Sequence, residues 1–282
     1  MIHIERINFD TYNHPKNNCN FIKDANDLTI NDLDYDTEIA RTNLLNYADL
    51  IQYPFDHSYQ FTKNEIDVLL GTMKTGIAVG RLSHLIEDDL EPIIDRMARS
   101  WINGKWFVRF NSCSPKDGNA KYPITSARQL IEMIVTSSRS RGALNHGDDT
   151  LYFVKYDTNW DSSRELRVFI HGQQITAITQ YSPYELSYYS DKTDSELTNF
   201  VLGIKKYLND IIPIICKRIG TNDLVCDLYL NDDGTFKIIE FNSFGYWLAS
   251  GSVLFHWLND YHVLYNRTND VYLRVLVSEL KN

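Results

Sequence analysis

Apolar and polar positions along the chain follow two different periods. Within 86–101 apolar residues recur at helical spacing, at Leu90, Ile93, Ile94 and Met97. This spacing predicts an amphipathic helix. Pro92 is best tolerated in a first turn, so the helix is expected to begin late in this stretch. A second helix is predicted over 125–138, with Thr125 or Ser126 as its N-cap.

Elsewhere the period changes to two, which predicts strands. The first such stretches are 106–110, 151–157, 165–171 and 174–180. The last two flank Gly172 and are expected to form a hairpin. A second hairpin is predicted from 224–230 and 235–242, which flank Asp233-Gly234.

The remaining stretches carry weaker signals. Thr193 and Glu196 form a capping-box pattern, which predicts a helix ending near Gly220 and kinked or broken at Pro213. The tail 252–280 is mostly helical in character. Residues 1–50 are rich in Asn and Asp with weak periodicity, and a helix is expected over 36–50. Together these elements predict an α+β protein whose antiparallel sheets and flanking helices form two interlocking subdomains.

Composition narrows the class of protein. The 282 residues are 43% hydrophobic, enough for a substantial core, and the formal charge of −9 argues against a broad nucleic-acid surface. A small basic pocket for a compact anion stays compatible with that charge. The chain has no apolar run of roughly 18 residues and no secretory signal at its N-terminus, so we expect a cytoplasmic protein without membrane contact. Its scattered cysteines predict neither disulfides nor a zinc site.

The second hairpin carries the first candidate chemistry. A loop of only Asp233-Gly234 places Asp227 opposite Glu240, whereas a loop of 231–234 makes them diagonal neighbours. Both registers leave Asp227, Glu240 and Asn242 on one face, and only an odd-length loop would separate them. Two carboxylates so close repel unless a cation lies between them, and these oxygen donors suit Mg²⁺. Alternatively, the two acids are separately solvated near a sheet edge.

A cation held by few protein ligands indicates a nucleotide, so cationic residues on strands are of interest. Arg109 and Lys116 flank a Ser-containing loop, Lys155 ends a strand, and Arg167 shares a strand face with Glu165. Each also has an ordinary structural explanation, as a surface charge or a surface ion pair of little energetic value. No phosphate-binding glycine loop is present, so strand side chains would have to hold the phosphates.

Several blocks in order resemble the cell division cycle protein 123 family, a divergent ATP-grasp group. The blocks are WFVRFNSCSPKD, RELRVF, LVCDLYLNDDGTFKIIEFNSFG and SVLFHW. The resemblance covers roughly 105–258, and the sequence is also similar to an ATP-grasp clade named for one arginine and two lysines. It implies an ATP-grasp-like core over 105–258, a divergent helical or irregular region over 1–104, and a C-terminal helix within 259–282 that packs on the core.

The resemblance also implies a ligand set of ATP and Mg²⁺. The nucleotide-binding residues that it implies are Arg109, Ser112, Ser114, Lys116, Val154, Lys155, Tyr156, Asp157, Glu165, Arg167, Asp227, Glu240 and Asn242, and the last three are the implied metal ligands. This sequence departs from the family pattern in having Arg109 for a usual Lys, Glu240 for Asp and Ser243 for Pro. Residues 1–100 do not match the family's region that docks its protein partner.

Two functions follow from the resemblance. One is an ATP-dependent assembly chaperone or binding factor for a protein partner such as the gamma subunit of translation initiation factor 2. The other is an ATP-dependent carboxylate–amine ligase that forms an acyl phosphate on a protein or peptide, with Arg167 beside that phosphate. Turnover of ATP with an acceptor would distinguish them. A third hypothesis is an interaction protein that binds no nucleotide.

Overall fold

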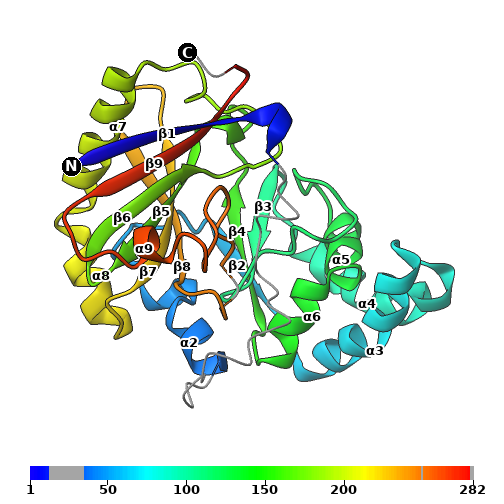
Figure 1. Cartoon of the computed structure of the whole chain (residues 1–282). Helices are drawn as coiled ribbons and strands as arrows, with labels where there is room; N and C mark the ends of the chain where they lie inside the picture. Colours follow the sequence, from blue (N-terminus) through cyan, green and yellow to red (C-terminus); the bar gives the residue numbers. More distant parts are fainter. Residues whose placement is uncertain (13–34, 249, 280–282) are drawn as a thin grey trace. The chain divides into compact units, whose positions relative to one another are not determined.

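A computed structural model describes residues 1–12, 35–248 and 250–279. The chain divides into two compact units, one formed by residues 1–51 and 160–282 and the other by residues 52–159 (Figure 1). The α+β class and the presence of two subdomains are confirmed. The segments 1–104, 105–258 and 259–282 stay a prediction about how the family pattern is distributed along the sequence. Among the described residues no helix is both long enough and apolar enough to cross a membrane.

The first unit is built on a six-stranded sheet in the order β1-β9-β6-β5-β7-β8. Its strands are β1 (Ile2–Asn8), β5 (Glu165–His171), β6 (Gln174–Gln180), β7 (Leu224–Leu230), β8 (Phe236–Ser243) and β9 (Val271–Val277). Both predicted hairpins, β5–β6 and β7–β8, are present and antiparallel. The sheet is nevertheless mixed, because β9 runs parallel to both β1 and β6.

One edge of this sheet brings together the two ends of the described chain: β1 is the edge strand and β9 pairs beside it, and the two run side by side in Figure 1. The prediction of a mostly helical tail is wrong: after the short α9 (Tyr261–Leu264) comes β9. Its sequence VYLRVLV buries Val271, Leu273 and all of 275–277, and this burial in a sheet outweighs any helical periodicity. The helix expected over 36–50 is confined to α2 (Tyr35–Arg41), followed by a 3₁₀ turn at Leu44–Asn46.

Two helices precede the β7–β8 hairpin. The predicted capping box is confirmed, since the Thr193 side chain and Glu196 exchange hydrogen bonds at the start of α7 (Asp194–Leu208). The predicted break is also present, because α8 (Ile211–Ile219) begins anew with Pro213 in its first turn, where a missing N–H costs little. One face of the sheet, the face that carries Phe169, Ala177 and Val225, is covered by an apolar cluster from the segment after β8. That cluster contains Phe244, Phe255, Trp257, Val263 and Leu264 together with Phe169, Ala177 and Val225 of the strands.

The β7–β8 register differs from both predicted loops. Leu230 pairs with Phe236, so the loop is 231–235 and has an odd number of residues. In a regular ladder a loop of odd length would put Asp227 and Glu240 on opposite faces. A β-bulge between Asp227 and Leu228 restores the phase by inserting one extra residue in β8. Asp227 therefore pairs directly with Glu240, as one of the two predicted registers requires.

The second unit has a three-stranded antiparallel sheet in the order β2-β4-β3 and four helices. Its elements are β2 (His57–Gln60), α3 (Lys63–Val79), α4 (His84–Arg99), β3 (Trp106–Arg109), α5 (Ala127–Val135), α6 (Ser138–Asn145) and β4 (Thr150–Lys155). Ser126 caps α5 as predicted. The expected place of Pro92 is wrong: it lies inside α4. Both Pro92 and Asp88, whose carbonyl loses its donor, are exposed, so water can satisfy that carbonyl.

Candidate functional site

A row of polar residues crosses the six-stranded sheet of the first unit. Register pairs join Glu5 to Arg274, Arg274 to Thr179, Thr179 to Arg167, Arg167 to Asp227 and Asp227 to Glu240. Directly paired residues point to the same face of a sheet. Three of the predicted site residues, from three different strands, therefore lie next to one another at one end of this row.

Arg167 and Asp227 form the buried centre of that end. The Arg167 Nε and Nη2 atoms donate to Asp227 Oδ1 and Oδ2, each at 2.8 Å. Only 7% of Arg167 and 1% of Asp227 are exposed. Burial lowers the pKa of the guanidinium, but the Asp227 carboxylate outweighs burial and raises the pKa overall. Removing one partner of such a buried pair costs about 3–5 kcal/mol, because the other charge is left uncompensated.

Arg167 also makes contacts beyond Asp227. Its Nη1 donates to the Gly251 carbonyl at 2.7 Å, and its guanidinium lies 5.0 Å from the centre of the Tyr181 ring. These contacts hold the guanidinium in place independently of Asp227. The guanidinium can therefore orient the Asp227 carboxylate. The pairing also holds both Asp227 oxygens in fixed positions, as a carboxylate that contributes to a metal site requires.

Asn242 and Glu165 complete the candidate residues of this unit. The Asn242 side-chain nitrogen donates to Asp227 Oδ2 at 3.1 Å, and Asn242 lies two residues beyond Glu240 on the same strand face. Glu165 accepts a hydrogen bond of 2.6 Å from Trp160 Nε1, and the Trp160 ring stacks on Tyr229 with 3.9 Å between centres. Glu165 and Arg167 are two apart on β5 and share a face. All five predicted residues of this unit thus lie on one face.

The donor chemistry of this cluster fits a hard cation. Two carboxylates and one side-chain amide are oxygen donors of the kind that Mg²⁺ takes together with phosphate oxygens. Glu240 and Asn242 are half-buried, whereas Asp227 is enclosed by Arg167. Among the described residues no cluster of three or more His, Cys, Asp and Glu side chains could hold a metal. A cation here would therefore need the Asn242 amide oxygen or ligands from a bound molecule.

The remaining predicted residues belong to the second unit and are more dispersed. Arg109 ends β3 and is 3% exposed; its Nε donates to the Phe110 carbonyl at 3.2 Å, and its guanidinium lies 5.8 Å from the Tyr53 ring centre. In the register Phe107 pairs with Val154 and Arg109 with Tyr152. Arg109 and Val154 accordingly share one sheet face.

Lys155 pairs with Trp106 and points to the opposite face of the same sheet. Lys155 is exposed at the end of β4, and its backbone N–H donates to Asp56. Tyr156 and Asp157 follow the strand; the Tyr156 ring is parallel to that of Tyr122 at 6.4 Å. The strand register therefore separates the two predicted phosphate-binding cations of this sheet.

The loop after β3 contains Ser112, Ser114 and Lys116. Ser112 is fixed by Asp148, whose Oδ2 accepts from the Ser112 N–H at 2.9 Å and from its hydroxyl at 2.5 Å. Ser114 is buried, and its carbonyl accepts from the backbone N–H of the exposed Lys116. Burial raises the pKa of the neighbouring Cys113 thiol, so this cysteine is protonated at neutral pH and a poor nucleophile.

Sequence reasoning missed Tyr47, which supports β8 between two of the candidate residues. The Tyr47 hydroxyl accepts a hydrogen bond from the Phe241 N–H at 2.9 Å and donates to the Phe241 carbonyl at 3.4 Å. Tyr47 lies in the Asn- and Asp-rich N-terminal stretch with weak periodicity, and no pattern in that stretch signals a contact with β8.

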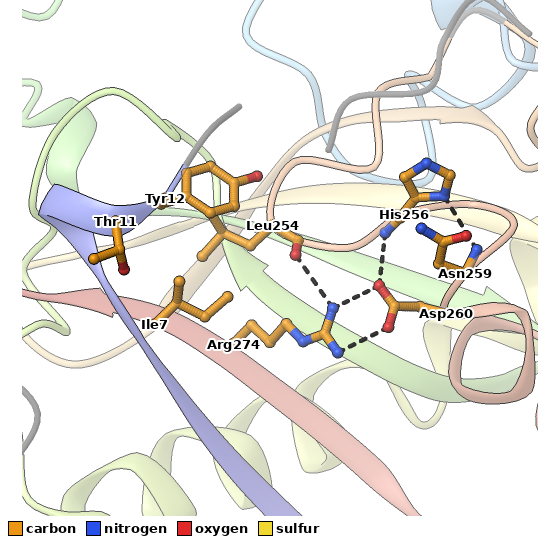
Figure 2. A pocket seen from close by; sticks show the side chains of 8 residues that line it. All are labelled: Ile7, Thr11, Tyr12, Leu254, His256, Asn259, Asp260 and Arg274. Atoms are coloured by element: carbon orange, nitrogen blue, oxygen red, sulfur yellow. Dashed lines mark hydrogen bonds and ion pairs between the residues drawn. The ribbon is translucent and has the colours of Figure 1, made fainter. Parts of the chain in front are cut away.

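Two cavities of the first unit are lined by other residues. Figure 2 shows one of about 260 Å³, lined by Ile7, Thr11, Tyr12, Leu254, His256, Asn259, Asp260 and Arg274. Arg274 binds Asp260 at 2.6 and 2.8 Å there, and it also binds Glu5 at 2.5 Å. A second cavity of about 380 Å³ is lined by His171, Gly172, Gln174, Asn222, Asp223 and Arg267. Neither cavity contains a predicted site residue.

Comparisons with known proteins agree on one family. The putative CDC123-like protein L884 of Acanthamoeba polyphaga mimivirus is 27% identical over 218 residues, which are 73% of this chain and 63% of that protein. The chain thus spans less than two thirds of that relative's length. The structure of Cdc123 from Schizosaccharomyces pombe is 15% identical and has a TM-score of 0.59. The match covers 88% of this chain and 99% of that one, so the two share a fold.

A C-terminally truncated form of the same yeast protein matches similarly, with a TM-score of 0.58, 15% identity and coverage of 86% of this chain and 98% of that one. The sequence model of the D123 family matches residues 137–281, a stretch that includes β4 to β9 and all five candidate residues of the first unit. This chain is therefore a member of the D123 family, to which Cdc123 belongs.

Proposed function

We propose that this protein binds ATP together with Mg²⁺ and acts as an ATP-dependent assembly chaperone or binding factor for a protein partner. The observation that carries the proposal is the end of the polar row, where Arg167, Asp227 and Glu240 pair in register and Asn242 adjoins them. A buried ion pair next to two half-buried oxygen donors is costly to build for stability alone. Such an arrangement is better explained by a ligand that supplies positive charge.

The residues of this cluster take different roles in the proposal. Glu240 and Asn242 offer the accessible oxygens for Mg²⁺, and Asp227 adds a third donor while Arg167 holds its carboxylate in place. Bound Mg²⁺ would neutralise charge on the phosphate oxygens. Glu165, fixed by Trp160, lies on the same face and would orient a polar group of the nucleotide.

The second unit carries further candidate groups for a phosphate or a base. Arg109 and Lys116 are cations that could pair with phosphate oxygens, and the loop with Ser112 and Ser114 offers hydroxyl groups. Val154 and Tyr156 are half-buried at and just after the C-terminal end of β4, and the proposal places the adenine ring against them. Lys155 points to the other face of this sheet, so it would reach a phosphate only by extending around the strand end. Lys155 is therefore the weakest member of the proposed set.

The protein partner is proposed from the family resemblance alone. The gamma subunit of translation initiation factor 2, or a protein like it, is the candidate, and a cytoplasmic location would accompany that role. Residues 1–100 lie outside the stretch that the D123 family model matches, so we expect the surface by which this chain contacts such a partner to differ in sequence from the family's.

Thermal unfolding with nucleotide tests the binding step. Mg²⁺ with ATP should raise the melting temperature, because a ligand that binds only the folded state stabilises it. Glu240→Gln should abolish most of the gain, since it removes the negative charge that attracts the cation but keeps the shape of the side chain. The exposed Asp191→Asn, on a loop of the same unit, is the matched control and should retain the gain. An equal gain in the Glu240 variant would contradict the metal role.

Phosphate release distinguishes the chaperone from the ligase. The proposed binding factor should retain ATP without hydrolysis, both alone and with the gamma subunit of initiation factor 2. Release of one phosphate per modified acceptor protein would instead favour the carboxylate–amine ligase. That outcome would leave the nucleotide site in place and overturn the chaperone role.

A further inference from the structure

We propose that Tyr47 is a positioning residue for the cation site, acting through the backbone of Phe241. This proposal rests on the proposed function, because it concerns the strand that carries Glu240 and Asn242. It extends the site to residues 35–51, which lie outside the stretch matched by the D123 family model. Tyr47 would touch neither cation nor nucleotide; it would set where the two oxygen donors stand.

The first argument is the position of β8 in the sheet. Among the strands of the described residues this one is last in the order, so within that part of the chain one side of its backbone has no neighbouring strand. The N–H and carbonyl of Phe241 point to that side, where both form hydrogen bonds with the Tyr47 hydroxyl, at 2.9 and 3.4 Å. Unpaired groups at a sheet edge leave a strand free to shift or fray. One phenolic hydroxyl here replaces the missing strand at a single residue.

The second argument is burial. Tyr47 is 0% exposed and Phe241 is 2% exposed, and their rings meet edge to face with 5.1 Å between centres and 82° between planes. A hydrogen bond enclosed in this way excludes water as a substitute partner. The rings fix the side chain of Phe241 and the hydroxyl fixes its backbone, so both movements of this residue are restricted.

The third argument is that the segment bearing Tyr47 is itself anchored. The Arg41 Nη1 atom donates to the carbonyls of Ile219 and Gly220, each at 3.2 Å, at the C-terminal end of α8, where a cation also complements the helix dipole. Arg218 of the same helix pairs with Asp49 at 3.2 Å. Contacts on both sides of Tyr47 therefore tie it to α8, and its hydroxyl does not simply follow β8.

The consequence for the site follows from chain connectivity. Phe241 lies between Glu240 and Asn242, so any displacement of its backbone moves both oxygen donors together. The bulge next to Asp227 has already interrupted the regular ladder on the inner side of β8. The hydrogen bonds from Tyr47 to Phe241 lie next to this irregular part of β8, on the opposite edge of the strand.

The test compares two substitutions that each delete one phenolic oxygen in the first unit. Tyr47→Phe removes the hydroxyl that holds Phe241. Tyr12→Phe is the matched control, because it removes a hydroxyl that donates to the Val253 carbonyl at 2.7 Å, away from β8. For both variants and the wild type, Mg²⁺ is titrated at a fixed concentration of a non-hydrolysable ATP analogue, and analogue affinity is measured again in EDTA.

We expect Tyr47→Phe to raise the Mg²⁺ midpoint by about three- to tenfold, the range set by one buried hydrogen bond. Affinity in EDTA should be unchanged, and Tyr12→Phe should match the wild type in both assays. A general loss of structure would weaken binding with and without Mg²⁺ alike. An unchanged Mg²⁺ midpoint in Tyr47→Phe, alongside metal-dependent binding by the wild type, would overturn the proposal.

Hydrogen exchange without any ligand separates this proposal from the proposed function. The Phe241 amide should exchange at least about tenfold faster in Tyr47→Phe than in the wild type, because its acceptor is gone. If the wild type binds no nucleotide but this amide loses protection, the proposed function fails and the support of β8 stands. If Phe241 protection is unchanged, the support of β8 is refuted whatever the nucleotide result.

Discussion

The two units present their candidate residues in different ways. In the first unit five of these residues share one face of a sheet, joined by a buried ion pair and the hydrogen bond from Asn242 to Asp227. In the second they lie on a strand end, a loop and opposite faces of a small sheet. The difference indicates that the fold of the first unit gathers its candidate residues in one place, whereas the fold of the second unit does not.

The ion pairs of the two units sharpen this comparison. In the first unit the most buried pair, Arg167 with Asp227, is part of the candidate site itself. In the second unit the strong pair of Arg96 with Glu65 joins α4 to the start of α3, and neither residue is a candidate. Stability and the proposed function therefore share residues in one unit and use separate residues in the other.

The largest expected effect is on the buried pair of the first unit. Arg167→Met should lower the free energy of unfolding by about 3–5 kcal/mol, because the buried Asp227 carboxylate is left without its partner. The double variant with Asp227→Leu should recover most of that loss, since no buried charge remains. Urea unfolding at neutral pH measures both. A single variant as stable as the wild type would show that this ion pair does not stabilise the first unit.

A smaller effect is expected for the pair of the second unit. Glu65 accepts from Arg96 at 2.6 and 2.5 Å and closes a capping box with Thr62. Glu65→Gln should cost about 1.5–3 kcal/mol, the range for a hydrogen bond to a charged group. Unlike Arg167→Met, it should leave the Mg²⁺ dependence of nucleotide binding unchanged. A change in that dependence would remove the separation between stability and function in this unit.

The same pair predicts a pH dependence. Burial raises the pKa of Glu65, but hydrogen bonds from Arg96 and Thr62 outweigh burial and lower the pKa below its ordinary value of 4.5. A lowered pKa in the folded state means that the pair contributes fully above about pH 4.5 and that its contribution is lost as the pH falls through the lowered value. In Glu65→Gln this part of the acid dependence should be absent. An unaltered acid profile would contradict the assignment.

The smallest expected effect on stability concerns Lys155. This residue is exposed, so Lys155→Ala should change the free energy of unfolding by no more than about 0.5 kcal/mol. If it reaches a phosphate, nucleotide affinity should fall by about tenfold, whereas the exposed Lys121→Ala should not alter it. Binding titrations of both variants decide the question. Equal affinities would remove Lys155 from the site and leave Arg109 and Lys116 as the cations of this unit.

Local sequence signals predicted much of the fold. The hairpin of β5 and β6, the capping box at Thr193 and the N-cap at Ser126 depend on neighbouring residues, and the structure has all three. The strands β1 and β9 were missed, because their pairing joins residues from opposite ends of the chain. A pattern of neighbouring residues does not predict a contact between segments so far apart in the sequence.

The site could be predicted only in part, for a related reason. The pairing of Asp227 with Glu240 was one of two registers expected, but the loop 231–235 and the compensating bulge were not expected, since both depend on how β8 fits the sheet. The bidentate contact of Arg167 with Asp227 requires the register between β5 and β7, which the sequence does not specify. The contact of Tyr47 with Phe241 could not be predicted, because it depends on the strand order that places β8 at an edge of the sheet.

Isothermal titration of the whole protein with ATP tests the central claim most directly, in Mg²⁺ and in EDTA, for the wild type and Glu240→Gln. The account predicts that the wild type binds ATP more tightly in Mg²⁺ than in EDTA, and that Glu240→Gln loses this difference while still binding in EDTA. Wild-type protein that binds no ATP in Mg²⁺, or a Glu240 variant with the full Mg²⁺ enhancement, would contradict it.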